Sequence, residues 1–354
     1  MTPVTYNGFD PLEIGESVAR RWMAREDWSR QYTTDLCNEG LLYLYDATGN
    51  RKYLDHVLKA WESAGSEAKD VNRNRPYFTC LHFDTWLRTG DTSFLQNFVM
   101  AANDVRTTTP RAEDGAVCYN YQPETKRIFI DMIQGYCTFM ARAGWFSDDA
   151  SFYDECSTQY RLFRDVLRNP ETGLWHQGRN WEATPNTLSP GHWNRGQGWV
   201  FRGLVECLYY LPDNSEAYRI IRDLMREFAA DYVQYQDARG MWHQLVAHPE
   251  AYPETSGTAF FLHYCLRAIQ RGWLPAEPYQ QVVDRGLDAL LGYVHRDGTV
   301  LNTSHGSGPL PSLEAYLHRP SAPGDFHGSG AVMMACAATA PAGSHRRLQN
   351  GPPK

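Results

Sequence analysis

Several features that would place a protein in a common class are missing from this chain of 354 residues. It has no phosphate-binding loop, dinucleotide-binding fingerprint or nucleophile elbow, and no aspartate-rich DxDD or DDxxD motif of a terpene cyclase. No cluster of His, Cys, Asp or Glu has the spacing of metal ligands, since His243 and His248 are not one helical turn apart. We therefore expect no cofactor and no metal.

An excess of positive charge and a long apolar run are also missing. The formal net charge is −7, with acidic and basic residues interspersed, which argues against a nucleic acid partner. No apolar run could span a membrane, and the N-terminus has no apolar leader. We expect a cytoplasmic protein without a membrane partner, monomeric or homodimeric. Residues 1–340 are expected to form one domain, and the polar residues 341–354 a disordered tail.

The eight cysteines include no Cys-x-x-Cys pair. Most of them lie inside apolar helical stretches such as residues 205–211 and 261–269. This placement predicts reduced cysteines in the core rather than disulfides or metal ligands.

Helical periodicity dominates the chain, and the helical segments come in pairs. Residues 40–62 read as two amphipathic helices joined at Thr48-Gly49, and residues 83–104 repeat this shape with a turn at Thr89-Gly90. Further helices are expected at 130–144, 149–168, 200–211, 216–233, 258–272, 279–294 and 328–340. Short charged loops alternate with long loops rich in aromatic residues, histidine and arginine. About six such hairpins, closed in a ring, would form an all-α barrel with the long loops at one functional end.

Aromatic residues make up 13% of the chain and are dense in residues 192–199, HWNRGQGW. Arg195 could present its planar fork to a carboxylate at a helix N-terminus, and Trp193 and Trp199 could stack on a sugar. The alternative is an arginine–aromatic packing contact in which the glycines serve only the turn. We favour binding. His176, beside a tryptophan, is a weaker candidate because such a histidine is more often structural.

Two predicted helix starts carry polar residues of interest. Asp131 follows apolar residues in RIFIDMIQG, so burial would raise its pKa and the helix N-terminus would lower it. A carboxyl group between these effects suits general acid–base chemistry near neutral pH, although a helix N-cap is at least as good an interpretation. In ETSGTAFF, Thr255 or Ser256 is expected to cap the next helix.

Together, four segments resemble the unsaturated glucuronyl and rhamnogalacturonyl hydrolases of glycoside hydrolase families 88 and 105, most closely family 105. The segments are IFIDM at 128–132, SPGHWNRGQGW at 189–199, MWHQLVAHPEAYPETSGTA at 241–259 and PSLEAYLHRPSAPGDFHGSG at 311–330. The resemblance implies an (α/α)6 barrel of six helical hairpins. Its implied substrate is an oligosaccharide that ends in a 4,5-unsaturated uronic acid, with the rhamnogalacturonan type favoured.

The resemblance also implies a reaction and a set of site residues. Asp131 would protonate C4 of the enol-ether double bond and then help water to add at C5, after which the hemiketal opens and releases the neighbouring sugar. Trp193 and Arg195 match family residues that hold the unsaturated sugar. His176 matches a histidine of the pocket, and Tyr32 an aromatic residue of the first inner helix.

The sequence departs from the family pattern at two positions of the expected site. Asn74 falls where the family usually has a second aspartate, and Asn120 where it often has a histidine. An ordinary glycosidase needs two carboxylates, whereas hydration through one carboxyl group tolerates these changes, because asparagine still donates and accepts hydrogen bonds. We hypothesise an active enzyme with altered substrate contacts at Asn74 and Asn120.

Two alternative functions stay open. An ordinary glycosidase or a sugar epimerase on the same barrel would need a second acid or base, for which Glu254 and Asp325 are the loop carboxylates to nominate. A catalytically inactive sugar-binding protein would also be compatible with Asn74 and Asn120.

Overall fold

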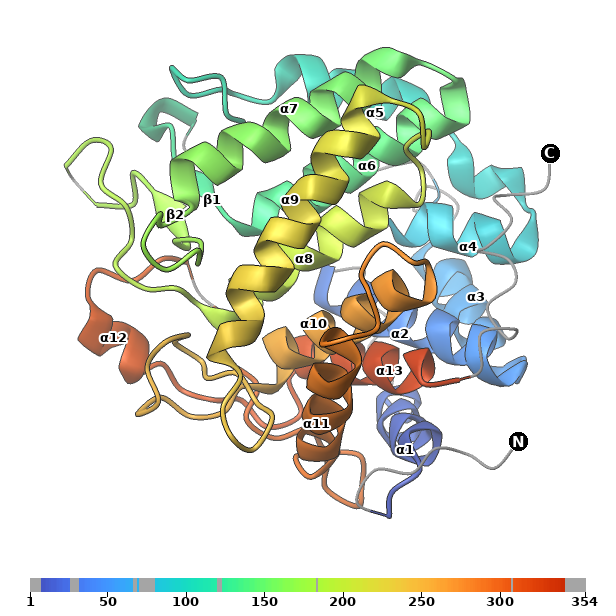
Figure 1. Cartoon of the computed structure of the whole chain (residues 1–354). Coiled ribbons are helices and arrows are strands. Elements are labelled where there is room, and N and C mark those ends of the chain that lie inside the picture. Colours follow the sequence, from blue (N-terminus) through green and yellow to red (C-terminus); the bar gives the residue numbers. More distant parts are fainter. Residues whose placement is uncertain are drawn as a thin grey trace.

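The computed structural model describes residues 8–25, 32–65, 69, 80–119, 123–182, 184–306 and 308–340, without the side chains of residues 32 and 33. Within these residues the chain is almost entirely helical (Figure 1). The inner helices are α2 (Tyr32–Thr48), α4 (Leu81–Thr89), α6 (Asp131–Ser147), α8 (Asn194–Leu208), α10 (Thr255–Gln270) and α13 (Phe326–Ala338). The outer helices are α1 (Pro11–Met23), α3 (Lys52–Ala64), α5 (Phe98–Thr108), α7 (Ala150–Leu167), α9 (Glu216–Tyr232) and α11 (Tyr279–Leu291).

The inner and outer helices differ in how their sequences are buried. Helices α6, α8, α10 and α13 are buried on nearly every side. For α13 this is expected from its apolar sequence, whereas α8 also buries charged residues such as Arg202 and Glu206. The outer helices are amphipathic, and α9 buries one stripe that includes Ile221, Met225 and Phe228. Each outer helix packs on its inner neighbour, so the all-α barrel predicted from the alternating loops is confirmed.

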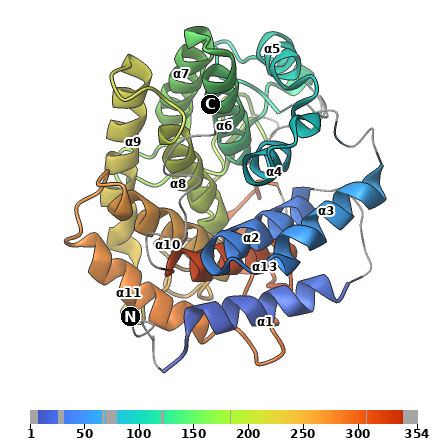
Figure 2. The ribbon, with the colours of Figure 1, turned by 90° about the vertical axis from the view of Figure 1, so that its right-hand side faces the viewer.

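The predicted hairpin turns are confirmed, and one helix was missed. Helix α2 ends at Thr48, and α4 ends at Thr89 before Gly90, whose φ of 74° closes the helix in the left-handed conformation. Helix α1 was not foreseen. It packs on α13, so the two ends of the described chain form the last hairpin of the ring (Figure 2).

Short elements complete the described structure. They are the strands β1 (Ile128–Phe129) and β2 (Gly178–Arg179), which pair antiparallel, the helix α12 (Leu313–Leu317), and the 3-10 turns η2 (Thr92–Leu95), η3 (Pro123–Thr125) and η4 (Val233–Tyr235). All eight cysteines are buried and free, as predicted. No helix of the described segments is long and apolar enough to cross a membrane. The cytoplasmic location stays a prediction, and the predicted tail at 341–354 lies outside the described residues.

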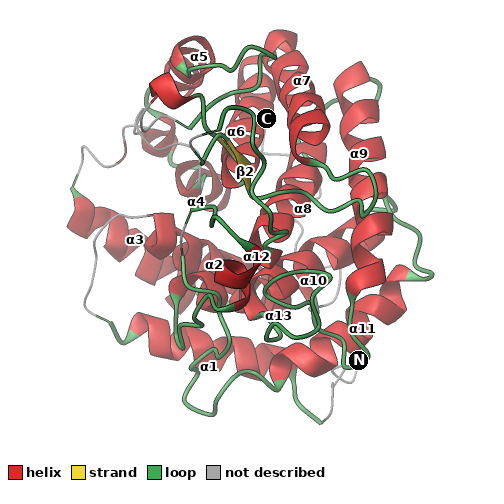
Figure 3. Ribbon diagram, turned by 90° about the vertical axis from the view of Figure 1, so that its left-hand side faces the viewer, coloured by secondary structure: helices red, strands yellow, loops and turns green. Residues whose placement is uncertain are grey.

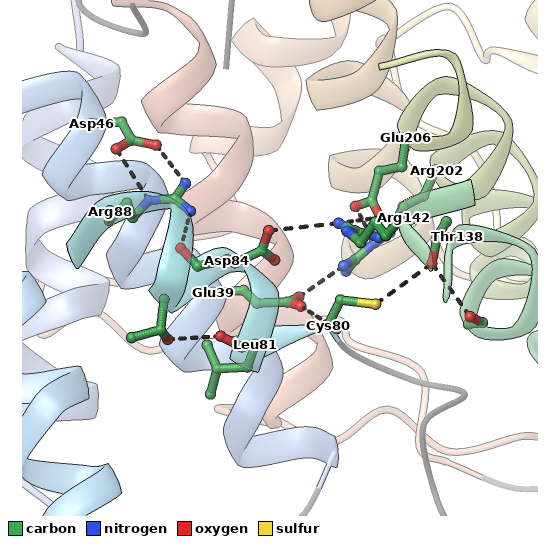
Figure 4. Close-up of polar contacts among 12 residues, drawn as sticks. Glu39, Asp46, Cys80, Leu81, Asp84, Arg88, Thr138, Arg142, Arg202 and Glu206 are labelled. Carbon is green, nitrogen blue, oxygen red and sulfur yellow. Dashed lines mark hydrogen bonds and ion pairs between the residues drawn. The ribbon is translucent and has the colours of Figure 1, made fainter. Parts of the chain in front are cut away.

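A chain of buried ion pairs crosses the interior of the barrel (Figure 4). Arg202 of α8 lies between Glu39 of α2, at 2.8 Å, and Glu206, at 2.9 Å. Glu206 also pairs at 3.3 Å with Arg142 of α6, whose other terminal nitrogen lies 3.6 Å from Asp84 of α4. The ion pairs therefore join four inner helices.

The pKa values of the carboxyl groups in these buried ion pairs follow from burial and from their arginine partners. Burial raises the pKa of Glu39 to about 8, and Arg202 offsets only part of that rise. Burial acts on Glu206 in the same direction, but Arg202 and Arg142 outweigh it and hold the pKa of Glu206 below its ordinary value. A cavity of only about 20 Å³ remains beside Glu206 and Arg142, which is room for about one water molecule. The interior at this depth is thus a filled core.

Removal of one partner of the buried ion pairs should lower the stability of the barrel. We expect Arg202→Met to lower the free energy of unfolding by about 3–5 kcal/mol, because Glu206 would keep its buried charge with only Arg142 as an ion-pair partner and Glu39 would lose its hydrogen bond from Arg202. Guanidinium-induced unfolding followed by circular dichroism measures the change. The matched control is Arg51→Met, which removes an exposed ion pair with Asp55 and should change stability by less than about 1 kcal/mol. Equal stabilities of the two variants would show that the buried ion pairs of Arg202 do not contribute to the stability of the fold.

Glycines let α8 and α10 cross closely at their N-termini. A Cβ atom at Gly257 would lie 2.5 Å from the carbonyl oxygen of Asn194, and one at Gly198 would lie 3.1 Å from the Cα atom of Gly257. Gly198 is one of the two glycines of the motif for which the sequence suggested a role in a turn. In the structure it serves helix packing instead.

Adding one methyl group at this crossing should be destabilising. We expect Gly257→Ala to lower the free energy of unfolding by about 1–3 kcal/mol, because the facing atoms are backbone and cannot rotate away. Thermal unfolding measures it, with Gly292→Ala as a control whose Cβ would approach no atom closer than 3.3 Å. A melting temperature unchanged from the wild type would contradict the close crossing.

Candidate active site

The long loops gather at the end of the barrel where the inner helices begin. Figure 3 looks onto this face, with β2 and α12 in front of the ring of helices. The pairing of Phe129 with Gly178 brings the loop before α8 to the start of α6, and the N–H of Ile130 donates to the carbonyl oxygen of Gln177 at 2.9 Å. Asp131 therefore lies directly beside the loop that carries His176 and Gln177.

Asp131 is the first residue of α6 and not its N-cap. The cap position belongs to Ile130, whose side chain cannot form a capping hydrogen bond, so the N-cap interpretation of Asp131 is wrong. Asp131 is 8% exposed, and its Oδ1 atom has no hydrogen-bond partner among the described residues. Burial raises the pKa of Asp131 from 3.8 to about 7, while Arg195 and Arg319 act in the opposite direction. Such a group exchanges a proton near neutral pH.

Arg195 is buried at the start of α8, and two of its three guanidinium nitrogens have no hydrogen-bond partner among the described residues. Its Nη1 atom donates to the carbonyl oxygen of Ser304 at 2.5 Å and to Oγ of Ser256 at 3.2 Å. Its Nε and Nη2 atoms have no partner among the described residues. These two groups share one edge of the guanidinium, which is the geometry that binds a carboxylate with two parallel hydrogen bonds.

Trp193 is buried beneath two guanidinium groups rather than open to solvent. Its ring centroid lies 4.3 Å from Cζ of Arg195 and 5.0 Å from Cζ of Arg319, and its Nε1 atom donates to Oγ of Ser304 at 2.9 Å. Only 1% of the residue is exposed. Trp193 therefore supports the cations in this structure, which combines the binding and packing interpretations of the motif.

Arg319 is a residue of this site that the sequence analysis did not single out. Its Nη2 atom donates to the carbonyl oxygen of Gly308 at 2.9 Å and to Oε1 of Gln177 at 3.5 Å. Tyr316 donates to the same Gln177 oxygen at 2.7 Å. The signal in the sequence was an arginine next to aromatic residues in the segment that we quoted for the resemblance.

The other residues of the motif are placed as follows. Trp199 is buried one turn below Arg195 and packs on Phe260 with ring centroids 4.5 Å apart. Gln197 exchanges hydrogen bonds of 3.0 and 2.7 Å with the backbone of Trp175, so it fixes the preceding loop to α8. Neither contact by itself requires a ligand.

His176 is half-buried and held by the loop. Its Nδ1 atom lies 2.7 Å from the carbonyl oxygen of Ser189, and its ring lies 4.6 Å from that of His192. Burial lowers the pKa of His176 and lowers that of His192 to about 3. Both imidazoles are therefore neutral near pH 7 and available as hydrogen-bonding groups.

The two carboxylates nominated as a second acid or base both cap helices. Glu254, and not Thr255 or Ser256, is the N-cap of α10, where its oxygens accept from the N–H groups of Ser256 and Gly257 at 2.9 and 2.8 Å. The capping prediction for Thr255 or Ser256 is therefore wrong, because the longer glutamate side chain reaches both donors from the position before them.

Asp325 caps α13 and accepts from Nδ1 of His327 at 2.6 Å. Burial raises the pKa of Asp325, but hydrogen bonding and the charges of His327 and Arg195 outweigh this, so the pKa is below its ordinary value. Asp325 is thus an ionised partner of a histidine.

Three predicted site residues cannot be placed by their side chains. Tyr32 is the first residue of α2, at the same end of the barrel, and its side chain is not described. Asn74 and Asn120 lie outside the described residues. The structure thus brings Asp131, Arg195, Trp193 and His176 to one end, together with Arg319.

With this geometry in place, the chain can be compared with known proteins. The sequence model of Glycosyl Hydrolase Family 88 matches residues 14–341. The chain therefore belongs to this family, as the four segments predicted, and it is a glycoside hydrolase.

The chain is also similar to individual hydrolases and to solved structures. The chain is 25% identical over 289 residues to the unsaturated rhamnogalacturonyl hydrolase YesR of Bacillus subtilis, which covers 79% of this chain and 81% of that protein. It is 26% identical over 206 residues to an unsaturated 3S-rhamnoglycuronyl hydrolase of an Alteromonas species, covering 56% of this chain and 48% of that protein. A possible GH105 member from Klebsiella pneumoniae superimposes with a TM-score of 0.80 at 21% identity, covering 96% of this chain and 95% of the other. The structural likeness establishes the (α/α)6-barrel fold.

The raised pKa of Asp131 predicts a pH-dependent penalty on stability. Because the folded state holds this proton more tightly than the unfolded state, the stability of the wild type should fall as pH rises from about 4 to about 7. Asp131→Asn lacks this penalty, so its melting temperature should exceed that of the wild type increasingly up to about pH 7 and by a constant margin above it. Calorimetry from pH 5 to pH 8.5 measures the difference. A margin that does not depend on pH would mean that Asp131 is not the group responsible.

Proposed function

We propose that the protein removes a 4,5-unsaturated uronic acid from the non-reducing end of lyase-generated oligosaccharides by hydrating the double bond. Asp131 acts as the general acid and base, and an oligosaccharide of the rhamnogalacturonan type is the favoured substrate. The observation that carries the proposal is a buried carboxyl group with a pKa of about 7 beside two guanidinium groups that keep unused donors. YesR of Bacillus subtilis, by its name an unsaturated rhamnogalacturonyl hydrolase, supports the substrate class.

Arg195 supports the choice of an acidic sugar. A buried guanidinium that forms no direct ion pair among the described residues is costly, and the free Nε–Nη2 edge matches the two oxygens of one carboxylate. Held in this way, the uronate would present its double bond to Asp131. His176 would offer a neutral hydrogen-bonding group from the adjoining loop.

The reaction needs one proton donor near neutrality. Protonated Asp131 gives its proton to C4 of the enol ether, which leaves positive charge shared between C5 and the ring oxygen. The resulting carboxylate takes a proton from water as the water oxygen bonds to C5. The hemiketal at C5 then opens to a ketone, as the C5–O5 bond breaks and the proton of the new hydroxyl passes to O5. The hemiacetal left at C1 collapses to an aldehyde, and the glycosidic oxygen leaves with the proton of O5–H as a hydroxyl of the neighbouring sugar. Asp131 has already regained its proton from the attacking water.

The placement of the other carboxylates argues against an ordinary glycosidase on this barrel. That reaction uses two carboxyl groups on either side of the anomeric carbon. Glu254 is fully buried and hydrogen-bonded to the start of α10, and Asp325 is bound to His327. Both are committed to helix caps, so hydration through Asp131 alone is the better fit.

Turnover of lyase products tests the proposal. We expect loss of the ultraviolet absorbance of the double bond with an unsaturated rhamnogalacturonan disaccharide, and weaker or no loss with glycosaminoglycan and ulvan disaccharides. Asp131→Asn should lower kcat by at least about 100-fold, since general acid–base catalysis contributes about 10²–10⁴-fold, while it still binds the disaccharide. For the wild type, kcat/KM should fall as pH rises above about 7, because the proton donor is lost.

The same measurements separate the competing functions. Binding without turnover by the wild type on every member of the panel would favour an inactive sugar-binding protein. Unchanged turnover by Asp131→Asn would remove Asp131 from the mechanism. Glu254→Gln is the comparison variant for a second acid, and at equal folded fraction we expect it to keep the pH profile of the wild type.

A further inference from the structure

Arg319 is a buried cation that the hydration mechanism does not use. It is 4% exposed and lies in the short segment after α12, and its guanidinium packs against the rings of Trp193 and Tyr316 at 5.0 and 5.2 Å. Its Nε and Nη1 atoms have no hydrogen-bond partner among the described residues. A buried guanidinium with two unused donors needs an acceptor, and preferably an anion.

The electrostatic surroundings do not supply that anion within the described chain. Burial lowers the pKa of Arg319 to about 10, and Arg195 acts in the same direction by repelling Arg319. Asp131 attracts it, but Asp131 must be protonated, and therefore neutral, at the start of the proposed reaction. At that moment neither guanidinium group beside Trp193 forms a direct ion pair among the described residues, and ionised Asp325 acts on Arg195 only from a distance.

The donors of the two arginines differ in geometry. Arg195 leaves one complete edge free, Nε with Nη2, which suits both oxygens of a carboxylate. Arg319 has its Nη2 atom engaged by Gly308 and Gln177, so its free Nε and Nη1 atoms lie on different edges. Arg319 therefore offers single hydrogen bonds to a neighbouring oxyanion and cannot duplicate the two-point grip of Arg195.

We propose that Arg319 is a second oxyanion-recognition residue of the site, which binds a carboxylate or sulfate oxygen of the substrate beside the group held by Arg195. The inference rests on the proposed function and extends it to substrate selection. The oxyanion has two possible sources, namely the carboxylate of the unsaturated ring itself and a sulfate ester on the neighbouring sugar. Gln177 positions Arg319, because its backbone pairs with the start of α6 and its side chain accepts from Arg319 and Tyr316.

Three matched disaccharides identify the recognised group. They are an unsaturated uronyl–rhamnose disaccharide, its carboxyl methyl ester, and the same acid with a sulfate ester on the rhamnose. If the ring carboxylate is recognised, Arg319→Met should raise KM about 10- to 100-fold for both acids and change KM for the ester much less, as expected for loss of a charge-assisted hydrogen bond. If the sulfate is recognised, KM should rise only for the sulfated acid. An equal rise for all three compounds would overturn the proposal.

Two further variants guard against a purely structural effect. Arg319→Lys keeps the charge, and it should retain part of the preference for acid over ester even if Arg319→Met is too unstable to assay. Arg51→Met removes an exposed arginine from the opposite end of the barrel and should leave all three KM values unchanged. In addition, the alkaline limb of kcat/KM should move to higher pH in Arg319→Met, because Arg319 lowers the pKa of Asp131. It should stay in place in Arg319→Lys.

Failure of the inference can be told from failure of the proposed function. Calorimetric binding of the three compounds does not depend on turnover. Loss of charge discrimination in Arg319→Met without turnover by the wild type would overturn the hydration reaction and keep the recognition role. If the wild type turns over the substrate and both Arg319 variants still distinguish the acid from the ester as the wild type does, the hydration reaction is kept and the recognition role of Arg319 is overturned.

Discussion

The pairing of buried charges inside the barrel is the constraint on which the rest of the structure depends. Glu39, Arg202, Glu206 and Arg142 are almost fully removed from water. Arg202, Arg142 and Glu206 keep their charges there because an opposite charge lies at hydrogen-bond distance, and Glu39, with a pKa of about 8, is held by its hydrogen bond from Arg202. Apolar contacts tolerate small rotations of a helix, whereas these short ion pairs do not. They therefore fix how α2, α6 and α8 are turned about their own axes.

That rotation also decides which residues point into the functional end. Arg195 precedes Arg202 by seven residues on α8, and Asp131 precedes Arg142 by eleven on α6. With about 3.6 residues per turn, both separations return to the same face of the helix after two and three turns. The ion pairs that hold the core thus aim Arg195 and Asp131 along the same interior. Deep in the barrel Arg202 and Arg142 pair directly with carboxylates, whereas at the loop end Arg195 and Arg319 form no ion pair among the described residues.

Much of this arrangement was predictable from local sequence, and the remainder depended on contacts between distant segments. The turns after Thr48 and Thr89 followed from helical periodicity interrupted by glycine. The burial of Asp131 followed from its apolar neighbours. The cap of α10 was missed because Glu254 is an unusual capping residue, which reaches the donors of Ser256 and Gly257 only in the folded loop. Arg319 was missed because its importance comes from Trp193, which lies far away in the sequence.

The carboxyl groups of the site have different roles, and this difference explains how one acid can serve the proposed reaction. Helix N-termini attract carboxylates, and Glu254 and Asp325 both occupy such positions and accept hydrogen bonds from backbone N–H groups there. For Asp325 the hydrogen bonds from His327 help to hold the pKa below its ordinary value. Asp131 also begins a helix, but its Oδ1 atom has no partner among the described residues, and burial outweighs the two nearby arginines. The same type of side chain thus caps a helix in two places and keeps a labile proton in the third. Asp131 differs from Asp325 in that neighbouring hydrogen-bond donors do not satisfy its negative charge. A second oxyanion brought by the substrate would therefore act on Asp131 through Arg195 and Arg319. By drawing the charge of these arginines to itself, the substrate would raise the pKa of Asp131 further and favour the protonated acid at the step that needs it.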